Sequence, residues 1–200
     1  MMTEVLAFNL WSTGHIVVED PGLVNYITTQ ARFVPKTGAR YAGNKFHKSK
    51  TFIVERLMNK LMVPGHKSKK HWRSSGHITG KANHVYNTVL EALKIVEART
   101  KKNPIEVFVK AVENGAPREE ILTIEYGGAR YPKAVECAPQ RRIDICLRYF
   151  AQGSFGKCFN SKKSLIDALA DEIVNAYNLS PNSMAISKKN DTERQSDSAR

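Results

Sequence analysis

Four histidines lie close together in the chain and are the first residues to consider for metal chemistry. They are His66, His71, His77 and His84, separated by five, six and seven residues. None of these gaps places two imidazoles one helical turn apart, and no cysteine lies near them. We therefore expect no metal site and interpret these histidines as solvated or as facing a nucleic acid.

The carboxylates and thiols also lack the spacing of a catalytic site. Glu119 and Glu120 are adjacent, and the alternation of a strand sends such neighbours to opposite faces. The chain has three cysteines and no C-x-x-C pair, which predicts reduced thiols without a disulfide framework or a zinc site. No G-x-S-x-G or Cys/His signature is present. We expect neither an enzyme nor a bound cofactor.

Positive charge is concentrated in one quarter of the sequence. The segment from Arg32 to Lys81 contains thirteen Lys or Arg and one acid, Glu55, an excess equal to the net charge of +12 of the whole chain. The remaining residues are therefore neutral in sum. Aromatic residues and histidines interleave with the charges, a mixture suited to pairing with phosphates and stacking on bases. The distribution favours a nucleic acid as partner.

A second group of candidate contact residues lies in a predicted β-hairpin over 120–137. Apolar and polar residues alternate from Leu122 to Tyr126, the period of a half-buried strand. Gly127-Gly128 supplies the left-handed backbone that a tight reversal needs. Arg130 and Tyr131 then lie at the tip, where a cation and an aromatic ring suit a polyanion with bases.

A helix is expected directly after the hairpin. Pro139 suits the first helical position, where its missing N–H costs nothing, and the helix is expected to end at Gly153. Its buried stripe begins at Ile143. Arg141 and Arg142 are expected to lie off that stripe, at the positive end of the helix, where they could bind phosphates.

Apolar residues at helical spacing predict further helices. They extend over about 51–63, 79–100, 103–114 and 161–177, with Asn103-Pro104 as a strong helix start and Ser161 as the cap of the last one. We expect a mainly α fold, a bundle of about five to six helices with one protruding β-hairpin. The expected regions are an N-terminal extension and basic arm (1–50), a helical core (51–179) and a polar C-terminal tail (180–200) with its last ten residues mobile.

The chain offers no signal for a membrane or for secretion. No run of about eighteen apolar residues is present, so we expect no membrane-spanning helix. The first eleven residues lack a basic region followed by a cleavable apolar one, which disfavours a secretory signal.

Several stretches resemble one protein family. These are the basic segment 37–50, the helix 53–62, the segment 102–120 leading into the hairpin, the Pro-x-Arg-Arg helix start after the hairpin, and the helix 168–176. They are similar to the universal ribosomal protein seven family of the small subunit, called protein five in the older eukaryotic numbering. The stretch around Trp11 and the residues near the C-terminus resemble the eukaryotic and archaeal branch.

The resemblance implies a specific role. Family members are structural proteins of the cytoplasmic small ribosomal subunit, assembled in the nucleolus in eukaryotes. They bind the 3′ major domain of small-subunit ribosomal RNA and help to nucleate the subunit head. Their hairpin lies near messenger RNA and exit-site transfer RNA, and neighbouring head and platform proteins pack nearby. The resemblance implies the same partners for this chain.

We therefore predict an RNA-binding surface made of basic residues and two tyrosines. The candidate residues are Lys36, Arg40, Tyr41, Lys45, Lys48, Lys50, Lys60, Lys67, Lys69, Lys70, Arg73, Lys81, Arg118, Arg130, Tyr131, Lys133, Arg141 and Arg142. Two alternatives remain open: an architectural nucleic-acid-binding protein outside the ribosome, since a helical body with a β-ribbon arm also suits DNA bending, and an enzyme acting on RNA.

Overall fold

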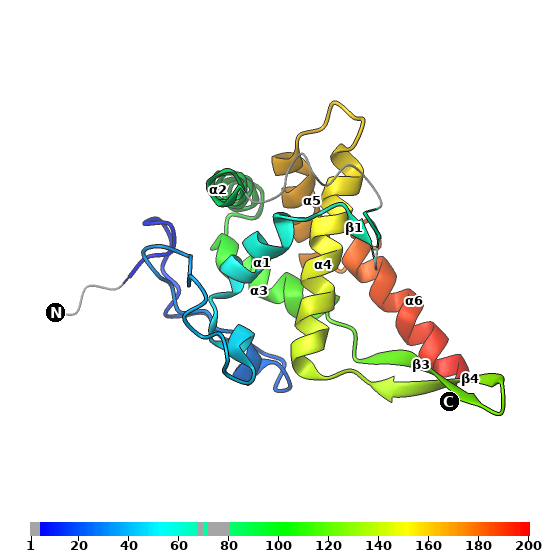
Figure 1. Cartoon of the computed structure of the whole chain (residues 1–200). Coiled ribbons are helices and arrows are strands. Elements are labelled where there is room, and N and C mark those ends of the chain that lie inside the picture. Colours follow the sequence, from blue (N-terminus) through cyan, green and yellow to red (C-terminus); the bar gives the residue numbers. More distant parts are fainter. Residues whose placement is uncertain (1–4, 68–69, 72–80) are drawn as a thin grey trace.

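The fold is mainly helical, with one long hairpin projecting from the body (Figure 1). The computed structural model describes residues 5–67, 70–71 and 81–200. The helices of this part of the chain are α1 (Ile53–Leu61), α2 (Ala82–Thr100), α3 (Pro104–Gly115), α4 (Pro139–Cys158), α5 (Leu165–Tyr177) and α6 (Met184–Ser198). The predicted fold class, a helical bundle with one protruding β-hairpin, is confirmed.

Helix α5 lies at the centre of the bundle and packs against α2, α3 and α4. Its Leu169 and Ile173 are fully buried, as are Ile143 and Phe150 of the stripe predicted on α4. The rings of Phe108 on α3 and Phe150 lie 6.2 Å apart between centroids. Burial of these large apolar side chains stabilises the body by roughly 1.5–3 kcal/mol each.

The hairpin consists of β3 (Glu119–Tyr126) and β4 (Ala129–Glu136), paired in an unbroken antiparallel register. Gly127 and Gly128 connect the strands with φ of 58° and 80°, the two positive values that a two-residue turn requires. Pro132 faces Thr123. Counted from the turn, this is a non-hydrogen-bonded pair, so the missing N–H of Pro132 costs no ladder bond.

The alternating side chains of β3 are not half-buried as predicted. Leu122, Ile124 and Tyr126 are 53%, 43% and 81% exposed. The hairpin extends beyond the helices (Figure 1), so this part of its surface has no core to cover it. The alternation correctly indicated a strand but wrongly indicated which environment the strand faces.

Residues 180–200 differ from the predicted polar tail with a mobile end. They contain α6, whose Ala185 and Ile186 are buried and which packs along β3 (Figure 1). The Arg118 backbone N–H donates to Glu193 Oε1 at 3.0 Å, and Arg200 forms an ion pair with Glu119. The helix thus braces the base of the hairpin.

The N-terminal residues dock on the body without a long helix. They contain two short 3₁₀ turns, η1 (Val24–Tyr26) and η2 (His47–Lys50), and Trp11 is buried with 6% exposure. A β-bridge joins Thr28 to Phe52, at the start of α1. A further short ladder pairs β1 (His66–Lys67) with β2 (Lys70–His71).

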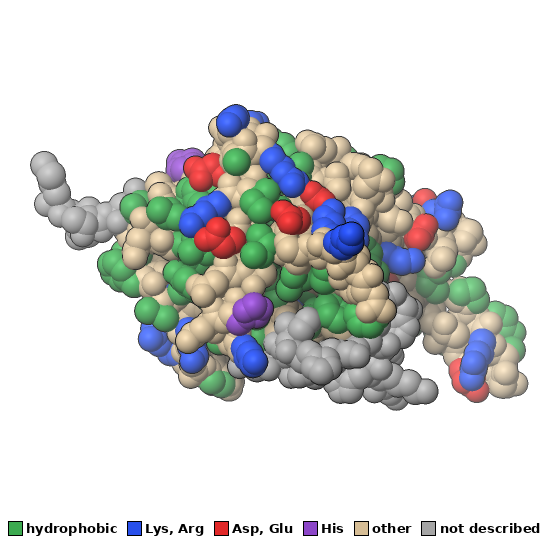
Figure 2. Space-filling view, turned by 90° about the horizontal axis from the view of Figure 1, so that it is seen from above, with side chains coloured by type: hydrophobic (Ala, Val, Ile, Leu, Met, Phe, Trp, Pro, Cys, Tyr) green, Lys and Arg blue, Asp and Glu red, His purple; other side chains and the backbone are tan. Residues whose placement is uncertain are grey.

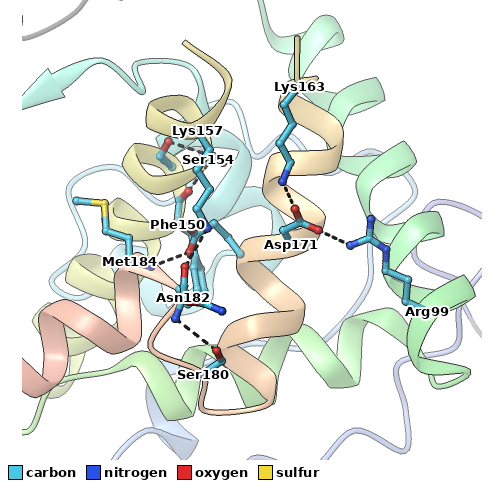
Figure 3. A network of polar contacts seen from close by, with 12 residues as sticks. Arg99, Phe150, Ser154, Lys157, Lys163, Asp171, Ser180, Asn182 and Met184 are labelled. Atoms are coloured by element: carbon cyan, nitrogen blue, oxygen red, sulfur yellow. Dashed lines mark hydrogen bonds and ion pairs between the residues drawn. The ribbon is translucent and has the colours of Figure 1, made fainter. Parts of the chain in front are cut away.

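The end of α4 and the start of α5 differ from those predicted. Helix α4 continues past Gly153 to Cys158, so α4 and not α2 is the longest described helix. Helix α5 is capped by Ser164 rather than Ser161, with the Ser164 hydroxyl accepting from the Asp167 N–H at 3.1 Å. Polar contacts secure this end of the bundle (Figure 3): Asp171 of α5 accepts from both Lys163 and Arg99.

Candidate RNA-binding surface

The single acid of the basic segment points into the protein. Glu55 lies on α1 and is only 3% exposed. Its Oε1 accepts from the backbone N–H of Thr37 at 2.8 Å and from the Thr37 hydroxyl at 2.9 Å. This pairing fixes the basic arm, residues 32–50, to the body. It also leaves the arm's surface without a negative charge of its own.

Most basic side chains of the arm point to solvent. Lys36, Arg40, Lys45 and Lys50 are exposed, which is the placement expected of phosphate-binding groups. Some of the interleaved aromatic rings contact basic side chains of the same arm. The Arg32 guanidinium lies 5.5 Å from the centre of the Tyr41 ring and donates to the Tyr41 hydroxyl at 2.6 Å. This hydrogen bond lowers the pKa of the Tyr41 hydroxyl.

Two basic residues bond to Asp144 of α4, Lys48 from the arm and Arg56 from α1. Lys48 and Arg56 both bond to Asp144, at 2.7 and 3.3 Å, and Arg56 also donates to the backbone oxygen of Tyr26 at 3.0 Å. Burial raises the pKa of Asp144, but the hydrogen bond from Lys48 and the charge of Arg56 outweigh it, so the pKa falls below its usual value. Lys48 therefore has a structural role as well as a partly exposed ammonium.

The other candidates of the basic segment are divided between described and undescribed residues. Lys60 is half-buried, and desolvation lowers its pKa. Lys67 and Lys70 are backbone partners in the β1–β2 ladder, and Lys81 is exposed just before α2. The remaining two candidates, Lys69 and Arg73, lie outside the described residues.

Arg141 is exposed at the base of the hairpin and is already paired. Its Nε and Nη2 atoms each donate to Glu120 of β3 at 2.7 Å, a two-point contact that joins α4 to the hairpin. This hydrogen bonding raises the pKa of Arg141. Because the side chain is 55% exposed, the guanidinium still presents positive charge at the surface.

Arg142 does not lie off the buried stripe, contrary to the prediction. It is 8% exposed, and its Nη2 donates to Asp20 Oδ2 at 2.7 Å while its Nε donates to the Pro117 oxygen at 3.2 Å. These partners come from the N-terminal region and from the loop before β3. Arg142 therefore joins three distant parts of the chain, and its role as a phosphate contact is withdrawn.

The hairpin presents two different faces. Strand alternation and the register place Leu122, Ile124 and Tyr131 on the face that also carries Lys133. Glu119 points to the opposite face, where α6 packs. Near the tip, Arg130 is 75% exposed and lies 3.7 Å from Glu125. The tip thus offers a cation and an exposed tyrosine ring, as predicted, together with apolar side chains that the sequence had assigned to a core.

Charge is mixed on the face seen from above the bundle (Figure 2). Lys and Arg side chains there alternate with Asp and Glu and with hydrophobic side chains. The basic segment differs from this face, because its one acid, Glu55 of α1, is buried.

Two structural partners of the surface were missed from the sequence. Asp20 and Glu120 hold Arg142 and Arg141 and so decide which of the two arginines is exposed. Strand alternation alone put Glu120 on one face of the hairpin, a signal that it could meet the following helix. Nothing in the sequence pointed to Asp20, which is 122 residues from its partner.

Two classes of function find no support in the described part of the chain. No group of three or more His, Cys, Asp or Glu residues there is placed to hold a metal ion. Within the same residues, no helix is both long and apolar enough to cross a membrane.

A helical body with a basic arm and a projecting, aromatic-tipped hairpin defines a polyanion-binding protein of the RNA-binding type. Comparison with known proteins gives the family. Residues 23–200 match the family model described as Ribosomal protein S7p/S5e, so the chain belongs to this family of ribosomal proteins. The resemblance seen in the sequence is thereby confirmed, and the family is one of structural ribosomal proteins rather than enzymes.

Archaeal relatives cover nearly the whole chain. The chain is 48% identical to small ribosomal subunit protein uS7 of Nanoarchaeum equitans over 193 residues, which is 96% of this chain and 98% of the relative. It is 43% identical to the Archaeoglobus fulgidus protein of the same name over 197 residues, covering 98% of this chain and 96% of the relative. These matches agree with the eukaryotic and archaeal branch expected from the sequence.

Proposed function

We propose that the protein is a structural component of the small ribosomal subunit that binds small-subunit ribosomal RNA. One observation carries the proposal. The segment that holds the whole net charge has a single acid, Glu55, and that acid is buried against Thr37 while four arm cations are exposed. The names of the archaeal relatives give the same subunit.

The protein binds RNA electrostatically, and its phosphate-binding groups are held at fixed positions on the helical body. The exposed lysines and arginines of the arm replace counterions on the phosphates, which makes affinity depend steeply on salt. The Lys48–Asp144 pair holds the arm on α4, and the Arg56–Asp144 pair holds α1 on α4, so the phosphate contacts of the arm are placed relative to the helical body. The protein thereby fixes the relative positions of the RNA segments that it touches.

We also propose which domain of the ribosomal RNA the protein binds and which RNAs its hairpin contacts. We place the binding site in the 3′ major domain, where the protein helps to nucleate the subunit head beside other head and platform proteins. The hairpin is directed at messenger RNA and exit-site transfer RNA. The exposed tip of the hairpin supports this assignment, because Arg130 can pair with a phosphate and Tyr131 can stack on a base.

The test is binding of the full chain to separate transcripts of the small-subunit RNA domains across a salt series. We expect the 3′ major domain to bind most tightly, with affinity falling roughly 10³- to 10⁵-fold between about 50 and 200 mM salt. Changing Lys36 and Lys45 to alanine should reduce the slope of log K against log salt by about 1 to 2. Changing the exposed Lys94 and Lys162 is the matched control and should leave the slope unchanged.

An architectural role outside the ribosome is the alternative outcome of this test. In that case duplex DNA of equal length would compete as well as the ribosomal RNA, and the protein would not sediment with small subunits in a gradient. Equal binding of all RNA domains with a salt slope near zero would remove the electrostatic mechanism itself.

A further inference from the structure

A cavity lies where the basic arm meets α1 and the first turn of α2. Its volume is about 470 Å³, within the range of sites for small ligands. Arm residues 33–39 form one side, and the other sides come from α1 and from residues 82, 83 and 86. The cavity is separate from the ion pair between Lys48 of the arm and Asp144 of α4.

The walls of the cavity suit a flat aromatic ligand. Phe33 at the arm side is 72% exposed, and Tyr86 on α2 packs against Phe8, with 4.9 Å between the ring centroids. Met58 and Met62 also line the cavity, and their flexible thioethers adapt to the shape of a ring. Aromatic side chains of this kind stack on unstacked bases in proteins that read single-stranded RNA.

One wall carries an acceptor whose second oxygen is unsatisfied. Glu55 lines the cavity, and its Oε1 is occupied by Thr37. Its Oε2 is buried and accepts no hydrogen bond from any residue that the structure describes. A buried carboxylate oxygen without a donor is costly. A ligand with an N–H group directed at Glu55 would remove that cost.

The surroundings of the cavity favour an anionic chain over a free neutral molecule. Lys36 lines the cavity and is exposed, and exposed Arg40 and Lys81 lie within one or two residues of lining positions in the sequence. Their positive charge complements a phosphate on either side of a base that enters the cavity. A nucleotide within an RNA strand combines that charge with a flat ring.

We propose that this cavity takes one unstacked nucleobase with an exocyclic amino group, from the RNA that the arm binds. The base stacks between the aromatic walls, its amino group donates to Glu55, and its flanking phosphates pair with the arm's cations. This inference rests on the proposed function, because the nucleotide belongs to the bound ribosomal RNA. It adds a base-reading pocket to the phosphate contacts proposed for the arm.

Two matched variants test the pocket in the RNA complex. Asn83 lines the cavity at an exposed position of α2, and Asn87 is exposed one helical turn later without lining it. We expect Asn83→Trp to fill the cavity and lower affinity for the 3′ major domain transcript about tenfold, with an unchanged salt slope. Chemical probing of the bases should show that this variant loses protection of one adenine, guanine or cytosine. Asn87→Trp should retain both affinity and protection.

A second measurement needs no substitution and decides the matter if Asn83→Trp folds poorly. The protein contains five methionines, of which Met58 and Met62 line the cavity and Met184 lies at the start of α6. With methyl-labelled methionine, we expect AMP, GMP and CMP at millimolar concentration to shift the Met58 and Met62 signals more than UMP does. The Met184 signal should stay in place.

The two ideas fail in different ways. If the wild-type protein binds the ribosomal RNA with a steep salt slope but Asn83→Trp and Asn87→Trp behave alike, and no nucleotide shifts Met58 or Met62, the pocket is overturned while the proposed function stands. If the wild-type protein does not bind ribosomal RNA at all, both are overturned.

Discussion

Gly153 of α4 lies so close to Glu172 of α5 that a Cβ atom on Gly153 would be 2.8 Å from Glu172 Oε1. Glu172 is fully buried, and its Oε2 accepts from the Ser183 hydroxyl at 2.9 Å and the Met184 N–H at 3.0 Å, while Oε1 lies 2.6 Å from Lys157 Nζ. The carboxylate therefore holds the start of α6. Figure 3 shows part of this region, with Lys157, Asn182 and Met184 converging between α4, α5 and α6.

The close approach predicts opposite effects of one substitution at two glycines of α4. Gly153→Ala should lower the free energy of unfolding by about 1 to 3 kcal/mol, because the added methyl displaces a buried carboxylate that holds the start of α6. Gly156→Ala should raise it by up to about 1 kcal/mol, because nothing lies within 4 Å of the new Cβ and alanine favours a helix. Urea unfolding followed by circular dichroism measures both. Equal effects at the two sites would contradict the packing described.

Substitutions of Arg142 and Arg148, both on α4, should distinguish a structural arginine from a surface one. Arg142→Ala should destabilise the protein by about 2 to 4 kcal/mol, because it leaves Asp20 and the Pro117 oxygen without their donor. Arg148→Ala, at an exposed position of the same helix, should change stability by less than about 0.5 kcal/mol. Thermal unfolding of both variants gives the comparison. If Arg142→Ala changed stability only slightly, Arg142 would be a surface contact rather than a structural residue.

The hairpin tip should affect function without affecting folding. Replacing Arg130 and Tyr131 with alanine should change the free energy of unfolding by less than about 0.5 kcal/mol, since both side chains are exposed. Sedimentation of small subunits should show normal incorporation, and reporter assays should show altered start-site choice or reading-frame fidelity. Arg141→Ala, at the hairpin base, should instead weaken binding to ribosomal RNA. Failure of the tip variant to assemble would refute this division.

Stability should fall at low pH through the carboxylate that holds Arg142. Burial raises the pKa of Asp20, but the hydrogen bonds from Arg142 and the Gly22 N–H outweigh it, so the folded pKa lies below the usual value. The stabilisation is thus complete above the unfolded pKa of about 3.9 and is lost as pH falls through the lower folded value. Asp20→Asn should make the free energy of unfolding depend less on pH between about 5 and 2. Glu97→Gln, at an exposed position of α2, should leave this pH dependence unchanged.

Structural features that depend only on a few neighbouring residues could be predicted from the sequence. Gly127-Gly128 forms the expected turn, and the Asn103 side chain accepts from the Ile105 N–H at 3.0 Å at the predicted start of α3. In both cases local backbone chemistry decides the structure. Of the candidate site, the exposed arm lysines and the hairpin tip followed from charge and composition in the same way.

Features that depend on distant partners could not be predicted. Arg142 looked like a surface residue because Asp20, 122 residues away, supplies its buried partner. Gly153 looked like a helix end, but the glycine is there so that α4 can approach α5, and the helix continues. The sequence of α6 is polar on average, so it did not indicate that Ala185 and Ile186 are buried against the body. Their packing stabilises the helix there despite its polar composition.

The bracing of the hairpin by α6 has a consequence for how the chain is made. Helix α6 begins at Met184, well after β4 has ended at Glu136, so on the translating ribosome the hairpin emerges before its brace exists. A chain that stops early would carry the arm, the core helices and the hairpin, but not the Arg200–Glu119 pair or the Glu193 contact to Arg118. Contacts between the hairpin and α6 therefore form only after synthesis has passed α6.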